Sequence, residues 1–371
     1  MIPLSSDDCE GRKRIRQNNS IKYYGEIPSI SRYIVRRTLI EARVKIVNTQ
    51  RTSAMGQICC AFAVVLLLFL TSDWPSLGQD KAAPQTKIVL LGTGTPLPDP
   101  ERSGPCTAIV VKGTPYLVDF GVGVVRRAAA ARNKGVKALE PTNLKIGFIT
   151  HLHSDHTLGF ADVMLTPWIM GRQEPFEVYG PAGTAAMSEH LLKAYETDIK
   201  TRTEGLEHSN TTGYRVNVHE IKPGVIYKDA NVKVTAFPVS HGQLEAFGYR
   251  FETPDRTIII SGDTTPSPAL LDNCHGCDVL IHEVYTQASF ELVSPEWKKY
   301  RRTHHTSSKQ LADIATKAKP GLLILYHRAN PGCDQARTDE CRQAGSEEQL
   351  LKEMREAYNG NVVAGHDLDI Y

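Results

Sequence analysis

One stretch of ten residues decides how the chain is read. It is Thr150-His151-Leu152-His153-Ser154-Asp155-His156-Thr157-Leu158-Gly159. A predicted apolar strand at 145–150 leads directly into it. Because alternate residues of an extended chain share a face, His151, His153 and Asp155 can all point the same way. The stretch therefore places three metal-binding side chains at the end of a buried strand.

The same stretch offers ligands for two metal ions. We predict a helix at 156–166, whose first turn brings His156 beside the extended segment. Two imidazoles would bind one ion, and a carboxylate with a third imidazole would bind a second ion close by. These ligands suit zinc, and they also suit iron, manganese or cobalt. A lone histidine is more often an ordinary surface or core residue, but a cluster this dense is costly without a cation.

Three further candidate ligands follow apolar strands elsewhere in the chain. His241 comes after Phe237-Pro238-Val239-Ser240, Asp263 after Ile260-Ser261-Gly262, and His327 after Leu322-Leu323-Ile324-Leu325-Tyr326. Each residue taken alone could be a loop residue with an ordinary hydrogen bond. Because polar side chains that follow buried strands converge on one rim, we expect these three to meet the 151–156 stretch.

Together these segments resemble the metallo-β-lactamase superfamily, and within it ribonuclease Z and its arylsulfatase-like relatives, over residues 86–371. The resemblance implies an α/β (α+β) fold, namely an αββα sandwich of two mixed sheets flanked by helices. It also implies two Zn²⁺ ions, with Mn²⁺ or Fe²⁺ as other candidates, and a bridging carboxylate. In the family's pattern, one ion is held by His151, His153 and His241, the other by Asp155, His156 and His327, and the bridge is Asp263.

Other segments match the same branch and carry further roles. Asp119, in Val118-Asp119-Phe120-Gly121, matches an early aspartate that supports the histidine loop from behind. Leu280-Ile281-His282-Glu283 and His305-Thr306-Ser307 match the family's proton-donating pair, which implies that Glu283 positions His305 as the acid. Asp155 would hold a metal and orient or deprotonate the attacking water. Tyr179-Gly180-Pro181 and Phe247-Gly248-Tyr249-Arg250 are further matching landmarks.

The chain departs from ribonuclease Z proper at one place. That family carries a long arm for transfer RNA between the Gly-Tyr-Arg and Ser-Gly-Asp strands, whereas here Arg250 is followed almost at once by Thr257. Residues 1–54 hold eleven basic and five acidic residues, a net +6, so the rest of the chain carries 32 basic and 36 acidic residues, a net −4. A nucleic-acid-binding domain is usually basic. We therefore expect a small ester substrate rather than tRNA, and the family resemblance is compatible with a homodimer.

The predicted reaction is hydrolysis of an ester by a hydroxide that bridges two metal ions. The leading hypothesis is an exported dinuclear zinc phosphodiesterase, and the alternative within the enzymes is an arylsulfatase-type sulfate-ester hydrolase. A di-iron oxidoreductase on the same fold is a different class, which the intact His153 and the lack of a flavin domain disfavour. A binding protein with a decayed site is disfavoured because all seven ligand positions are filled.

The N-terminal region predicts export. An apolar run at 58–70 has the length of a signal-peptide core, which suggests a signal peptide at 55–78 with cleavage near Gly78. The alternative is an uncleaved membrane anchor, and either reading places the catalytic domain outside the cytoplasm. Residues 1–54 would then be a disordered or mis-assigned extension, and 79–85 a linker. Of the cysteines beyond this point, Cys333 and Cys341 are the best disulfide candidates.

The predicted secondary structure alternates strands and helices. The predicted strands are 87–91, 107–111, 116–120, 145–150, 176–179, 214–221, 232–238, 247–252, 257–261, 279–282 and 322–326. The predicted helices are 122–133, 156–166, 183–196, 307–318 and 346–357. Cys274 and Cys277 are read as a turn with structural or paired thiols rather than a zinc knuckle. Trp168 and Tyr285 are candidates for the substrate cleft, although core packing explains them equally well.

Overall fold

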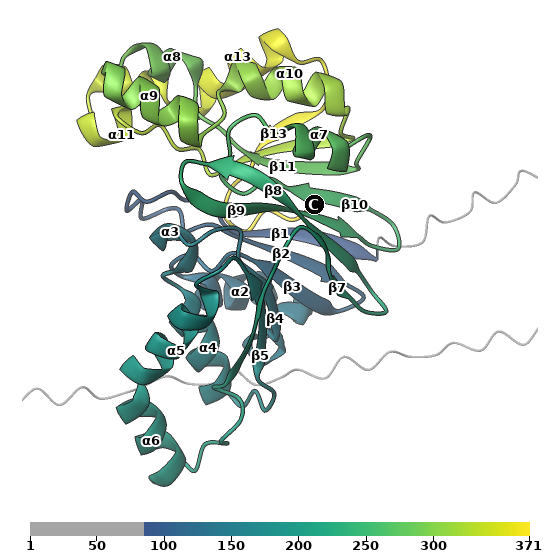
Figure 1. The fold of residues 1–371 in the computed structure, drawn as a ribbon, viewed down its shortest axis with the longest axis vertical. Coiled ribbons are helices and arrows are strands. Elements are labelled where there is room, and N and C mark those ends of the chain that lie inside the picture. Colours follow the sequence, from purple (N-terminus) through teal and green to yellow (C-terminus); the bar gives the residue numbers. More distant parts are fainter. Residues whose placement is uncertain (1–84) are drawn as a thin grey trace, which may run out of the picture. The chain divides into compact units, whose positions relative to one another are not determined.

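The computed structural model describes residues 85–371, which form two β-sheets packed face to face with helices on both outer sides (Figure 1). The strands of the first sheet are, in spatial order, β1 (Thr86–Gly92), β2 (Cys106–Val111), β3 (Thr114–Val118), β4 (Ile146–Phe148), β5 (Phe176–Gly180) and β6 (Val216–Glu220). Those of the second are β13 (Val362–Ala364), β12 (Leu322–Tyr326), β11 (Val279–Glu283), β10 (Thr257–Ile260), β9 (Leu244–Glu252), β8 (Lys233–His241) and β7 (Gly224–Lys228).

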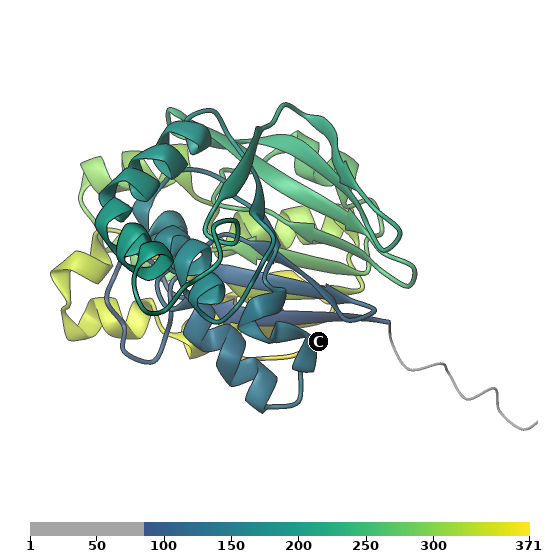
Figure 2. The same ribbon diagram turned by 90° about the horizontal axis from the view of Figure 1, so that it is seen from below.

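Each outer layer of helices belongs to one half of the chain (Figure 1). In Figure 2, which is seen from below, the helices of the first half lie in front of the sheets. The helices of the first half are α2 (Val124–Asn133), α3 (Ser154–Thr157), α4 (Phe160–Ile169), α5 (Thr184–Ala194) and α6 (Glu196–Glu204), with short 3-10 turns at Lys137–Leu139 and Pro141–Asn143. Those of the second half are α7 (Pro268–Asn273), α8 (Gln287–Glu291), α9 (Pro295–His304), α10 (Ser308–Ala318), α11 (Cys333–Ala336), α12 (Asp339–Ala344) and α13 (Glu347–Ala357).

The period-two pattern of the strands creates three apolar layers. In β1, Ile88 faces the layer between the two sheets, whereas Val89 faces the layer beneath α2 and α4. In β10, Ile258 faces the layer between the sheets, and Ile259 faces the layer beneath α7, α10 and α13. A strand that is apolar at every position is expected where both faces are covered. The αββα sandwich implied by the family resemblance is confirmed.

Strand direction brings the candidate ligands to one edge. The strands from β3 to β6 run parallel, and so do those from β10 to β13. β8 is antiparallel to β9, which is antiparallel to β10, so β8 and β10 end on the same side. The segments after β4, β8, β10, β11 and β12 therefore meet at one rim, which is where open α/β sheets bind their ligands.

One predicted helix is divided in two. The sequence predicts a single helix at 156–166, but α3 ends at Thr157 and α4 begins at Phe160. Gly159 lies between them, and its amide donates to the carbonyl oxygen of Phe120 over 2.7 Å. A β-carbon on Gly159 would lie only 2.3 Å from the carbonyl oxygen of Gly121. This close approach of two backbones interrupts the helix.

Several N-terminal predictions concern residues that the structure does not describe. The signal peptide or anchor at 55–78, the extension at 1–54 and most of the linker at 79–85 lie outside residues 85–371. Among the residues that are described, no helix combines the length and the apolar character that crossing a bilayer requires.

Two cysteine pairs form disulfides in the second half of the molecule. Cys333 and Cys341 are joined, as the sequence predicts, and Cys274 pairs with Cys277 across the turn between α7 and β11. Among the described residues, Cys106 is free and buried. The Cys274-Cys277 pair is thus a closed turn, in line with the prediction of paired thiols.

We expect the Cys333–Cys341 disulfide to stabilise the fold. It closes a short loop, and the loss of chain entropy in the unfolded state is worth about 2–3 kcal/mol for such a loop. The variant with both Cys333→Ser and Cys341→Ser should therefore unfold at lower temperature than the parent, as measured by thermal denaturation without reductant. When reductant is added, the unfolding temperatures of the variant and the parent should become equal. A difference in unfolding temperature that persisted under reduction would contradict this account.

Candidate metal centre

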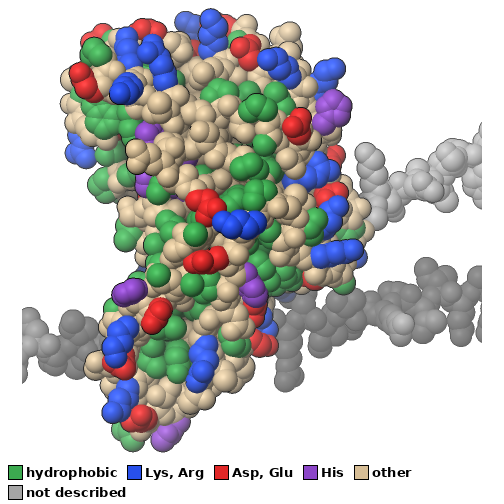
Figure 3. Space-filling view, viewed as in Figure 1, with side chains coloured by type: hydrophobic (Ala, Val, Ile, Leu, Met, Phe, Trp, Pro, Cys, Tyr) green, Lys and Arg blue, Asp and Glu red, His purple; other side chains and the backbone are tan. Residues whose placement is uncertain are grey.

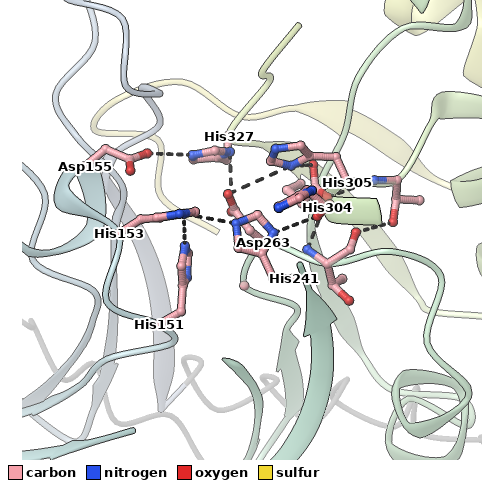
Figure 4. A network of polar contacts seen from close by, with 12 residues as sticks. His151, His153, Asp155, His241, Asp263, His304, His305 and His327 are labelled. Carbon is pink, nitrogen blue, oxygen red and sulfur yellow. Dashed lines mark hydrogen bonds and ion pairs between the residues drawn. The ribbon is translucent and has the colours of Figure 1, made fainter. Parts of the chain in front are cut away.

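The side chains predicted as ligands converge at the rim of the two sheets (Figure 4). The segment after β4 supplies four of them, and the ends of β8, β10 and β12 supply one each. All seven belong to groups whose ligand atoms lie within 4.8 Å of one another: His151, His153, Asp155, His156, His241, Asp263 and His327. The convergence expected from the strand ends is therefore present in the structure.

Only the first part of the histidine stretch is extended with alternate side chains on one face, as predicted. His151 and His153 share one group, as an extended segment predicts. Asp155 lies instead on α3, beside His156, and belongs to the second group. The chain turns into helix two residues earlier than predicted. This early turn is what divides the stretch between two metal positions.

The first group consists of three imidazoles. The Nδ1 atom of His153 lies 3.1 Å from Nε2 of His151 and 3.0 Å from Nε2 of His241. Ligands of a tetrahedral zinc ion lie about 3.3 Å apart, so this triad has nearly the spacing of a metal tripod. Burial lowers the pKa of His151 well below its ordinary value and that of His241 to about 4. Neutral imidazoles with free lone pairs are the form that binds a metal.

The remote nitrogens of this triad are held by hydrogen bonds. The Nδ1 atom of His241 donates to the carbonyl oxygen of His304 over 2.7 Å, and the Thr150 hydroxyl lies 3.0 Å from Nδ1 of His151. Such contacts fix the ring orientation and leave Nε2 for the ion.

The second group combines imidazoles with carboxylates. Oδ2 of Asp155 lies 3.1 Å from Nε2 of His327 and 3.5 Å from Nε2 of His156. Oδ1 of Asp263 lies 3.4 Å from Nδ1 of His327 and 3.5 Å from Nε2 of His156. Asp263 also groups with His151, so its carboxylate lies between the two sets of ligands.

The second group has the chemistry of a cation site. Within residues 85–371, Nε2 of His156, Oδ1 of Asp263 and Nδ1 of His327 are buried without a hydrogen-bond partner. A divalent cation would satisfy all three. Burial opposes a positive charge on His156, but Asp119, Asp263 and Asp155 outweigh it and raise its pKa. The same carboxylates would attract a metal ion, so the residues present fit a dinuclear centre.

Two residues beside the centre have unusual backbone conformations. Asp119 and His327 directly follow strands and adopt left-handed φ angles of 63° and 40°. Non-glycine residues seldom adopt this conformation outside turns and helix ends, and such strain is often found at functional sites. Gly262, with φ 62°, needs to be glycine because a β-carbon there would lie 3.0 Å from Cβ of Thr150.

Asp119 supports the histidine stretch from behind, which matches its predicted position. Its Oδ1 accepts from the Thr150 amide over 2.7 Å, and its Oδ2 accepts from Nδ1 of His156 over 2.8 Å. We expect Asp119→Asn to weaken metal binding about 10- to 100-fold, because the amide cannot accept at both positions. Zinc titration against a competing chelator measures the change. Asp313→Asn is the matched control and should bind as the parent does, because Asp313 is an exposed aspartate on α10 outside the metal centre.

The predicted proton-donating pair lies on the other side of the centre. Oε2 of Glu283, at the end of β11, lies 3.4 Å from Nδ1 of His305. Oε1 of Glu283 accepts from the amide of Thr306 over 2.9 Å, which fixes the loop that carries His305. Ser307 caps α10 through a capping box with Gln310 and anchors the same loop. His305 lines the cleft, so it can reach a bound ester.

A cleft of about 240 Å³ opens over the metal centre. Its walls include Pro96 and Leu97 from the loop after β1, and Trp297 and Tyr300 from α9. The two aromatic rings lie edge to face, with centroids 5.5 Å apart, and Tyr300 is 5.7 Å from the His305 ring. α9 and its two aromatic residues are not among the elements and site residues predicted from the sequence. The i, i+3 spacing of two aromatics just before His305 is the signal that could have revealed them.

The two aromatic residues that the sequence suggested for the cleft lie elsewhere. Trp168 is buried in the layer beneath the first sheet, where Nε1 donates to the carbonyl oxygen of Asn210. Tyr285 is buried against Phe290 and the Arg301 guanidinium. Neither residue lines the cleft, so the core interpretation is correct for both.

The fold and the ligand set define a class, that of the metal-dependent hydrolases built on an αββα sandwich. Residues 114–328 match the family model described as the β-lactamase superfamily domain. A ribonuclease Z of Mycobacterium bovis is 32% identical over 287 residues, which span 76% of this chain and 96% of the relative. A ribonuclease Z of Mycolicibacterium gilvum is 35% identical over 246 residues, or 65% and 83% of the two chains. The chain belongs to the metallo-β-lactamase superfamily, in its ribonuclease Z branch.

Solved structures show the same fold at lower identity. The metallo-β-lactamase fold protein YhfI from Bacillus subtilis superposes with a TM-score of 0.58 at 15% identity, over 77% of this chain and 98% of that one. The short form of human tRNase Z superposes with a TM-score of 0.54 at 21% identity, over 77% and 98% of the two chains. Both likenesses concern the fold.

Proposed function

We propose that the chain is an exported dinuclear zinc phosphodiesterase that hydrolyses small organic esters. The observation that supports this most is a set of overlapping three-residue groups of candidate ligands, in which Asp263 joins His151 and His156 in one group and His241 and His305 in another. The relatives in sequence are named ribonucleases, and ribonucleases cleave phosphodiester bonds. Two bound zinc ions supply a nucleophile from water near neutral pH and offset the negative charge that develops on the ester.

The residues of this chain have separate tasks in the proposed reaction. His151, His153 and His241 would hold one ion, Asp155, His156 and His327 would hold the other, and Asp263 would contribute to both, as the proximity of these ligand atoms allows. Asp155 lines the cleft and would orient the attacking water. His305 would protonate the leaving-group oxygen, with Glu283 holding its ring through Nδ1. Burial raises the pKa of Glu283, and the contact with His305 opposes this rise.

Transfer RNA is a poor fit for this site. Four residues, 253–256, separate β9 from β10, so the connection has no room for an RNA-binding arm. Within the part of the chain that the structure describes, the cleft is lined by no lysine or arginine. The face in Figure 3 mixes acidic and basic side chains, and histidine atoms are visible where α9 approaches the sheets. A protein that grips a polyanion needs a basic track.

Export is supported by the two disulfides. Disulfides persist in oxidising compartments and are rare in the cytosol. The apolar run at 58–70, which lies outside the described residues, would direct the chain there as a signal peptide or as an anchor. N-terminal sequencing of the protein recovered from cells tests the signal peptide: a chain that begins near Gln79 supports cleavage, and a chain that retains residues 55–78 supports the anchor.

A panel of chromogenic esters tests the proposed activity. The full chain, loaded with zinc, should cleave bis-(p-nitrophenyl) phosphate faster than p-nitrophenyl sulfate, and metal analysis should find two zinc ions per chain. The reverse preference would favour the sulfate-ester hydrolase instead. Turnover of neither ester would contradict both functions, and iron with redox activity would point to the di-iron class.

A further inference from the structure

A second cavity lies beside the cleft, next to Asp155. It has a volume of about 520 Å³ and lies between the loop at 95–104, the residues at the start of α2, and α3. Thr95, Pro96, Leu97 and Asp155 line both this cavity and the cleft over the metal centre. The two spaces are therefore adjacent, and Asp155, a predicted metal ligand, lies at their common boundary.

The second cavity is mainly apolar. Pro98 and Leu97 form one side, and Val122 and Leu158 form the other. Val122 and Leu158 are 56% and 64% exposed, and both line this cavity. Exposed apolar groups that cluster at a cavity indicate a binding surface. Neither Val122 nor Leu158 belongs to one of the three apolar layers described above.

The charge of the cavity disfavours an anionic occupant. Its one basic side chain in the described structure is Arg102. The guanidinium of Arg102 lies 3.6 Å from Asp99 and 3.9 Å from Glu347, so its charge is balanced by two carboxylates. Asp155 adds a further carboxylate at the junction with the cleft. An uncharged group fits this cavity better than a second phosphate would.

The position of His305 indicates which of the two cavities would hold the leaving group and which the retained group. His305 lines the cleft together with Trp297 and Tyr300, but it does not line the second cavity. A proton donor must lie within reach of the leaving-group oxygen. The leaving group therefore belongs beside Trp297 and Tyr300, and the group that stays on phosphorus extends the other way, past Asp155.

We propose that the cavity bounded by Leu97, Val122 and Leu158 is the subsite for the retained alcohol group of a phosphodiester, and that this group is apolar and uncharged. The proposal rests on the proposed function, because it assigns a substrate class to that same site. A monoester would leave this cavity empty, so the enzyme should favour diesters. A hydrophobic subsite of this kind discriminates by about tenfold for each one or two buried methylenes.

Two esters with the same leaving group test the subsite. Butyl p-nitrophenyl phosphate and methyl p-nitrophenyl phosphate have the same charge and the same nitrophenolate, and they differ only in the retained alcohol. We expect kcat/KM of the zinc-loaded full chain to be at least about tenfold higher for the butyl ester. Thymidine p-nitrophenyl phosphate, whose retained group is polar, should be a poorer substrate than the butyl ester.

Substitutions of exposed side chains that line the second cavity test whether the preference for the butyl ester arises there. Leu158→Ser and Val122→Ser should reduce the butyl-to-methyl ratio of kcat/KM to about three or less. Both side chains are exposed, so folding should be preserved, as circular dichroism and zinc content would verify. Leu206→Ser is the matched control, since Leu206 is 99% exposed and lines neither cavity, and the ratio should not change.

The outcomes separate this proposal from the function on which it rests. Cleavage of both esters with equal kcat/KM, or a ratio that Leu158→Ser leaves intact, would overturn the subsite while the phosphodiesterase stands. A thymidine ester that outperforms the butyl ester would overturn the apolar assignment. If no diester is cleaved at all, the proposed function fails and the subsite fails with it.

Discussion

Replacing His156 by alanine should reduce ester hydrolysis at least about a thousandfold, on the order of 4 kcal/mol in activation free energy. His156 is fully buried, its Nδ1 donates to Asp119, and its Nε2 is directed toward Asp155 and Asp263. Its loss would empty one ligand position and remove an imidazole that lies 3.5 Å from the carboxylates of both Asp155 and Asp263. We therefore expect the variant to retain about one zinc ion per chain instead of two.

Metal analysis combined with steady-state kinetics checks this expectation. His190→Ala is the matched control, because His190 is exposed on α5 and takes no part in the centre. It should keep both ions and parental activity. A His156→Ala protein that is folded and retains activity within tenfold of the parent would show that the second ion is not needed for the reaction.

Replacing His305 by alanine should act on the chemistry without removing the metal. Loss of a general acid costs about 10²- to 10⁴-fold in rate. The loss should be largest for esters with poor leaving groups, because nitrophenolate departs without a proton. Zinc content should stay at two per chain, since His305 is outside the seven predicted ligands.

A series of aryl phosphodiesters that differ in leaving-group pKa measures this effect. The slope of log kcat against that pKa should become steeper in His305→Ala. Glu283→Gln should move the slope in the same direction to a smaller extent, because the amide still holds the His305 ring but lacks the negative charge. If His305→Ala kept full turnover of a poor leaving group, the proton donor would have to be another residue.

Much of the strand framework follows from local sequence. The run Leu322–Tyr326 is a strand over the predicted residues, and β10 differs from its prediction at 257–261 by one residue. Such runs are apolar at every position because helices and the second sheet cover both faces. The ligands at the ends of β8, β10 and β12 could be anticipated for the same reason, since strand ends of one sheet share a rim.

The elements that the sequence did not predict are held by tertiary contacts. α9 is rich in charge, and Arg301 is buried in it with its guanidinium bonded to the Pro331 carbonyl and the Ser289 hydroxyl. Because the buried side chain is an arginine and the rest of α9 is mostly polar, the helix has no periodic pattern of apolar residues from which it could be predicted. β7 contains only exposed and half-buried residues, which do not alternate, and it forms an edge strand through its pairing with β8.

The division of the chain has a consequence for assembly. Residues up to Glu220 build the first sheet, and residues from Gly224 onward build the second, so each half of the chain contributes part of the ligand set. Bound ions would therefore cross-link the two halves of the chain, because each ion would be coordinated by residues from both. Fragments cut between β6 and β7 should therefore reassociate far more tightly in zinc than in a chelator, because metal that binds only the paired form shifts the association equilibrium.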